Sequence, residues 1–169
     1  YKINQIIGFS HIHSWTMGGL LTMPVTGPLK IKPGEENEPD SGYRSRINHK
    51  NEKASLSYYS VLLDDYNIKA ELTSTTRTGF QRYTFPKSDS SRILFDLENG
   101  SEYPYEVRWA SISKVSDYEI EGFSTQSSYD EPTNLLNDYT VYFVARVDKP
   151  MKSFGTWVNG YVDTTSSIC

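Results

Sequence analysis

Hydrophobic and polar residues alternate with a period of two over much of the chain, which is typical of half-buried β-strands. Ile68, Ala70 and Leu72 alternate with polar residues and would share one face of a strand. The run 139–147 also alternates, but it is apolar on both faces for much of its length, which predicts a central strand. Further predicted strands cover residues 59–63, 79–85, 92–97, 106–115, 118–123 and 154–158.

Turn signals separate these strands at intervals of roughly ten residues. Asp64, Asp65, Tyr66 and Asn67 form a predicted hairpin turn, and residues 86–90 form a predicted loop. No segment shows a helical pattern. Many short strands with regular turns predict an all-β fold, an antiparallel β-sandwich with few or no helices. The length of 169 residues suits a single domain over 1–169.

Composition supports a β-fold and narrows the classes of function. The chain has 13 tyrosines, and aromatic residues favour pleated, half-buried surfaces. The net charge is −4 and no run of Lys and Arg occurs, so we expect no nucleic-acid partner. No stretch is apolar enough to span a bilayer, and no signal peptide is recognisable. Cys169 is the only cysteine, which excludes an internal disulfide.

A long polar segment over 33–57 interrupts the alternation. Its first part is acidic and is expected to be solvated, whereas its second part is basic and aromatic. Loops of this length are usually functional or disordered. Arg44 and Arg46 are two positions apart and could face the same way. They could contact a substrate or pair with the acidic residues just upstream.

The segment His11-Ile-His-Ser-Trp15 lies between two apolar runs and carries the densest candidate chemistry. In an extended chain His11 and His13 point to one face and could bind a metal, but no third ligand pattern accompanies them. They could instead satisfy buried backbone groups. In a third interpretation the segment binds a sugar: Trp15 would stack on the ring, and the histidines and Ser14 would bind hydroxyls.

Four stretches of the chain, in order, resemble glycoside hydrolase family 92, the bacterial exo-acting α-mannosidases. They are IIGFSHIHSWTMGGLLTMPVTG, YRSRINHKNEKASLSYYSVLLDDYNIKAELTSTTRTGFQRYTFPKSD, YEIEGFS and VYFVARVDKPMKSFGTW. The resemblance is to the family's N-terminal domain. The family's usual Asn-Pro-Phe-Ile-Gly-Thr opening and the strands expected after Ile168 are not in the chain, so we expect a partial domain.

The resemblance implies a two-domain enzyme in which this β-sandwich packs on a helical (α/α) domain. It implies calcium at the junction, bound by the complete enzyme rather than by this chain alone, and hydrolysis with inversion. The catalytic acid and base would come from the helical domain, so this chain would carry no catalytic residue and no metal ligand. Its expected substrate-binding residues are His11, His13, Trp15 and Arg46.

The resemblance further implies mannose-containing glycans as substrates and a periplasmic or secreted location. Ser14, Trp15 and Gln81 stand where many family members carry other residues, which is expected to alter the mannoside accepted. Two alternatives from other classes stay open. The chain could be a stand-alone carbohydrate-binding β-sandwich, or a purely structural sandwich whose histidines belong to the core.

Overall fold

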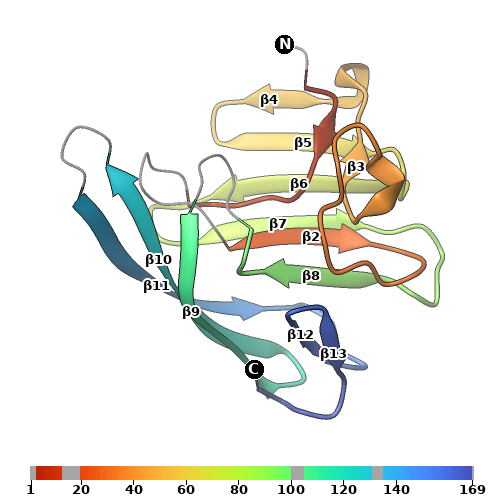
Figure 1. Ribbon diagram of the computed structural model, residues 1–169. Coiled ribbons are helices and arrows are strands. Elements are labelled where there is room, and N and C mark those ends of the chain that lie inside the picture. Colours follow the sequence, from red (N-terminus) through yellow and green to blue (C-terminus); the bar gives the residue numbers. More distant parts are fainter. Residues whose placement is uncertain (1–2, 13–19, 100–104, 131–134, 169) are drawn as a thin grey trace. The chain divides into compact units, whose positions relative to one another are not determined.

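The computed structural model describes residues 3–12, 20–99, 105–130 and 135–168 (Figure 1). Within these ranges the chain is all-β and its strand pairs are antiparallel, as the sequence predicts. The helical elements described are two short 3-10 turns, η1 (Pro39–Ser41) and η2 (His49–Asn51). No described helix has the length and apolar character needed to cross a membrane.

The chain forms two compact units. The first takes the residues up to His11 together with Leu21–Asp96, and the second takes mainly the residues from Leu97 onward. The sheets of the first unit are β4-β5-β6-β7, β2-β8 and β1-β3. Their strands are β1 (Gln5–Ile6), β2 (Leu21–Val25), β3 (Ser45–Arg46), β4 (Lys53–Ser55), β5 (Tyr58–Leu63), β6 (Ile68–Ser74), β7 (Gly79–Thr84) and β8 (Arg92–Asp96).

The hairpin of β5 and β6 confirms the alternation read from the sequence. Ile68 and Ala70 are fully buried in the core. The predicted turn joins the two strands, and Asn67 adopts a φ of 50° there. Asparagine tolerates this left-handed conformation better than most residues do, which explains its place at the end of the turn.

Glu71 lies on the polar face of β6, but its neighbours bury it to 8% exposure. Arg82, directly opposite on β7, donates two hydrogen bonds of 2.9 Å to its carboxylate. Tyr58 donates another at 2.7 Å, and Lys69 a fourth at 3.1 Å. The hydrogen bonds from Arg82, then those from Tyr58 and Lys69, lower the pKa of Glu71 to about 2.

We expect Glu71 to make the protein sensitive to acid. Because folding lowers its pKa from 4.5 to about 2, its contribution to the free energy of unfolding is complete above pH 4.5 and disappears as the pH falls towards 2. The urea concentration at the midpoint of unfolding should therefore decrease as the pH falls through this window. The decrease should be smaller for Glu71→Gln. Glu121→Gln, at an exposed position, should retain the native pH dependence. Equal pH dependence in the native chain and Glu71→Gln would contradict the assignment.

The polar segment over 33–57 is ordered and closes tightly at its acidic part. The Tyr43 amide donates to the Lys32 carbonyl at 2.9 Å, and the Arg44 amide donates to the Pro33 carbonyl at 3.2 Å. The acidic residues are exposed, as predicted: Glu35, Glu36, Glu38 and Asp40. Tyr43 is buried and donates a 2.5 Å hydrogen bond to the buried Asp96. One tyrosine thus anchors the loop to the end of β8.

The second unit is built on the three-stranded meander β9 (Tyr105–Ser116), β10 (Glu119–Asp130) and β11 (Leu135–Arg146). A short hairpin of β12 (Thr156–Val158) and β13 (Tyr161–Asp163) follows. β10 runs further than the predicted 118–123, because buried polar side chains continue it. Gln126 is one of these, and it accepts a hydrogen bond from the Tyr139 hydroxyl at 2.9 Å.

The prediction that residues 139–147 form a central strand is wrong for this sheet. β11 lies at one edge, with β10 in the middle. Its second apolar row is exposed rather than covered, since Tyr142 and Val144 expose 77% and 65% of their surface. A strand that is apolar on both faces therefore does not reveal its position in the sheet here.

Candidate functional site

His11 ends the segment that runs beside the first residues of β2. Phe9 and Thr22 exchange two backbone hydrogen bonds of 2.9 Å, which fix this segment antiparallel to β2. The His11 imidazole is partly exposed, and partial burial lowers its pKa from the ordinary value. No hydrogen-bond partner of the ring is found among the described residues.

Two side chains of β7, those of Gln81 and Tyr83, contact the His11 segment or its partner residue Thr22 on β2. Gln81 accepts hydrogen bonds from Thr22 Oγ1 at 2.7 Å and from the Tyr83 hydroxyl at 2.5 Å. The rings of Phe9 and Tyr83 lie 6.2 Å apart. Burial raises the pKa of Tyr83, so its hydroxyl stays a donor. Gln81 is thus a supporting residue beneath the His11 segment.

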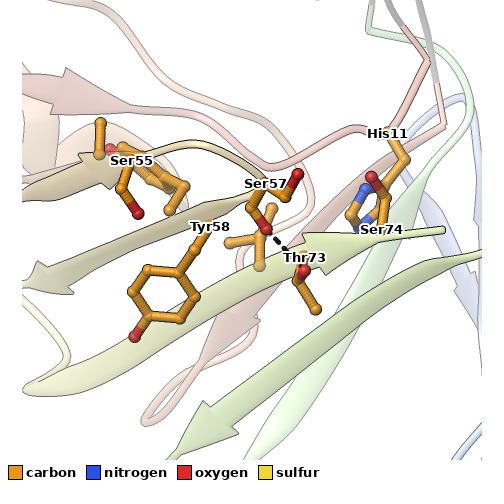
Figure 2. A pocket seen from close by; sticks show the side chains of 9 residues that line it. His11, Ser55, Ser57, Tyr58, Thr73 and Ser74 are labelled. Carbon is orange, nitrogen blue, oxygen red and sulfur yellow. Dashed lines mark hydrogen bonds between the residues drawn. The ribbon is translucent and has the colours of Figure 1, made fainter.

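A shallow depression of about 260 Å³ opens beside His11 on the β4-β5-β6 hairpins (Figure 2). Its lining, apart from His11, consists of Ala54, Ser55, Ser57, Tyr58, Tyr59, Leu72, Thr73 and Ser74. We call this hollow the His11 depression. No Asp, Glu, Lys or Arg is found among the described residues that line it. Neutral hydroxyls beside apolar carbons and aromatic rings suit a polyhydroxylated ligand better than an ionic one.

The serine and threonine residues of this lining were not predicted from the sequence. A signal was present, because residues 54–60 read Ala-Ser-Leu-Ser-Tyr-Tyr-Ser, but it is not specific, since residues 124–129 read Ser-Thr-Gln-Ser-Ser-Tyr. Thr73 already uses its hydroxyl to donate to the Ser57 carbonyl at 2.6 Å. In Figure 2 the hydroxyls of Ser55 and Ser74 lie at opposite ends of the labelled group.

Arg46 lies on β3 and is held by carboxylates. It donates to Asp65 at 2.8 Å through Nε and at 2.5 Å through Nη2, and it contacts Asp40 at 3.1 Å. Hydrogen bonding to Asp65, with the charges of Asp65 and Asp40, raises the pKa of Arg46. Burial alone would raise the pKa of the Asp65 carboxyl. The hydrogen bonds from Arg46 outweigh this effect, so the pKa of Asp65 is lowered.

The contact of Arg46 with Asp40 is the pairing with the upstream acidic residues that was one of its two sequence interpretations, whereas Asp65 lies downstream and was not predicted as its partner. Arg46 does not line the His11 depression. Arg44 has different partners, the carbonyls of Pro33 and Gly34 and the side chain of Gln5. Asp65 is a turn residue, as predicted, and also the principal partner of Arg46.

His13 and Trp15 fall outside the described residues, so the predicted pairing of His11 with His13 stays a prediction. Within the described part of the chain, no three His, Cys, Asp or Glu side chains converge in a way that could hold a metal ion.

The second unit has a hollow of its own on the exposed face of its meander. It has a volume of about 500 Å³, and its lining includes the aromatic rings of Phe123 and Tyr142, the hydroxyl of Ser111 and the carboxylate of Glu121. The rings of Phe123 and Tyr142 lie 5.7 Å apart. Trp109 is 72% exposed. This face combines aromatic rings with hydroxyls, as sugar-binding surfaces do.

The family model and the solved structures that match this chain belong to the same family. The model of the glycosyl hydrolase family 92 N-terminal domain matches residues 1–168. A family GH92 α-mannosidase from Bacteroides thetaiotaomicron, solved in complex with mannoimidazole, shares 29% identity over 99% of this chain, with a TM-score of 0.83. A second structure of that α-mannosidase gives the same values. The chain spans 24% of the length of these structures. No curated protein matches the chain significantly.

Proposed function

Because this chain belongs to the glycosyl hydrolase family 92 N-terminal domain family, we propose that it is the non-catalytic β-domain of an exo-acting α-mannosidase. In this proposal it supplies one wall of a sugar site at the junction with a helical catalytic domain. The observation that carries the proposal is the family match over residues 1–168. The neutral, hydroxyl-lined depression beside His11 supports it, because it suits a sugar.

The proposed contributors are His11, His13, Trp15 and Arg46. His11 would exchange hydrogen bonds with sugar hydroxyls through a neutral ring, and Trp15 would stack on the apolar side of the pyranose. Arg46 already has two carboxylate partners, so it would reach a substrate only as the outer member of that cluster. None of these residues serves as the acid or the base in this proposal.

The chemical step would belong to the helical domain. An inverting glycosidase needs two carboxyl groups about 6.5–9.5 Å apart, with a water molecule between them. Calcium is part of the proposal for the complete enzyme, with its ligands outside the described residues. The proposed location is periplasmic or secreted, where glycans are degraded outside the cytoplasm.

The test is an assay of the complete enzyme that carries this chain. We expect release of free mannose from the non-reducing end of α-mannosides, with the β-anomer formed first and visible by proton NMR. Matched α-glucosides and α-galactosides should be poor substrates. No mannose release from any α-linked mannobiose would contradict the proposal, and initial formation of the α-anomer would contradict inversion.

A second candidate function is a stand-alone carbohydrate-binding module, favoured by the exposed aromatic face of Trp109, Phe123 and Tyr142. The discriminating measurement is calorimetric titration of the chain with mannose and α-mannobiose. Saturable binding that is lost in Trp109→Ala would favour the module. The absence of binding, together with mannose release by the complete enzyme, would favour the α-mannosidase domain.

A further inference from the structure

Three residues on one face of β7 lie against the segment that ends at His11 or against its partner residue Thr22. Residues two apart on a strand share a face, so Gly79, Gln81 and Tyr83 form one row. Tyr83 contacts the ring of Phe9, and Gln81 binds the side chain of Thr22, the backbone partner of Phe9. At the third position of the row, Gly79, the neighbour is the His11 ring itself.

The third position has room for that ring because it has no side chain. A Cβ atom at Gly79 would lie 2.2 Å from Cδ2, 2.4 Å from Cγ and 2.7 Å from Nε2 of His11. Real Cβ atoms do not approach other atoms so closely, so the ring would have to shift from this position. Gly79 has no positive φ, so its backbone alone does not demand glycine.

We infer that Gly79 is a positioning residue: its missing side chain lets the His11 imidazole lie against β7 and face the His11 depression. Gly79 pairs directly with Ser74, which lines that depression, so a side chain at 79 would share the face of Ser74. The bearing of this inference on sugar turnover rests on the proposed function.

The test compares Gly79→Ala with the native protein by NMR of the His11 ring. The titratable groups lining the depression besides His11 are the phenols of Tyr58 and Tyr59, which donate to Glu71 and Glu52. Burial holds the pKa of His11 below its usual value, so displacement into solvent should raise it towards 6.5. An unchanged His11 titration and unchanged ring shifts would overturn the inference.

Two controls separate positioning from general damage. Thr78→Ala places an alanine one residue away, in the exposed turn, and should leave the His11 titration unchanged. Thermal unfolding of Gly79→Ala should stay close to native, because the position is exposed and extended. A His11 titration that shifts equally in Thr78→Ala would overturn the inference.

Kinetics of the complete enzyme then report on the proposed function separately. Small misplacements of a substrate-contacting group can cost up to about a hundred-fold, so we expect kcat/KM to fall about ten-fold or more in Gly79→Ala. The same change should have little further effect in a His11→Ala background, because both act through one ring. A shifted His11 titration with native kinetics would support the positioning and count against His11 as a substrate contact.

Discussion

Trp15→Ala in the complete enzyme is expected to reduce kcat/KM for α-mannosides by about thirty-fold or more, because truncating a central stacking tryptophan commonly costs about 2 kcal/mol or more. The expectation rests on the proposed function and on the place of Trp15 in the sequence, four residues after His11. Initial-rate kinetics on an α-linked mannobiose measure it. Folding of the variant is checked by its thermal unfolding temperature.

Trp15→Phe is the matched control, since phenylalanine retains an aromatic face but lacks the indole N–H. If stacking is the role of Trp15, Trp15→Phe should recover most of the activity. If the role of Trp15 is to donate a hydrogen bond through its indole N–H, both variants should lose activity to the same extent. Native kinetics in Trp15→Ala would remove Trp15 from the sugar site.

Gly42→Ala is expected to destabilise the first unit by about 3 kcal/mol, because overpacking a tight backbone contact forces the surrounding chain to move. A Cβ atom at Gly42 would lie 2.1 Å from the amide nitrogen of Gly34 and 2.3 Å from the carbonyl oxygen of Pro33. Both neighbours are backbone atoms, which cannot turn aside as a side chain can. Urea denaturation measures the loss.

Glu36→Ala is the control within the same loop. Its side chain is exposed, and its backbone carbonyl, which accepts from Gln5, is retained. We expect its free energy of unfolding to change by less than about 0.5 kcal/mol. A Gly42→Ala variant as stable as Glu36→Ala would show that the loop opens without cost and that the approach of Gly34 and Gly42 is not essential.

Local patterns predicted the hairpin of β5 and β6 well, because its alternation and its turn residues lie within a few positions of each other. Ile68 and Ala70 are buried, and the turn 64–67 lies where expected. Glu71 departs from the pattern, because its burial depends on Arg82 on the next strand. The pattern of residues within one strand does not show which residue of the neighbouring strand will pair with a given side chain.

The candidate site was predicted only in part. His11 was singled out from the sequence, and in the structure it lines a depression together with neutral hydroxyl residues. The serine and threonine lining comes from β4, from Ser57 between β4 and β5, and from β6, and only the pairing of these strands brings it beside His11. Gly79 could not be recognised from the sequence, because its role comes from a ring 68 positions earlier in the chain.

The pairing of β2 with β8 sets the order in which the first unit can fold. Val25 lies opposite Arg92 in the register, and Leu21 lies opposite Asp96, whereas β5, β6 and β7 pair with their neighbours in sequence. Closing a long loop costs more entropy than closing a short one, so the local hairpins should form first during synthesis. Until the ribosome has delivered β8, the strand of Leu21, Met23 and Val25 can pair only with the segment of Phe9 on its other side. A nascent chain halted near residue 90 would expose these three side chains and be a natural client for a chaperone.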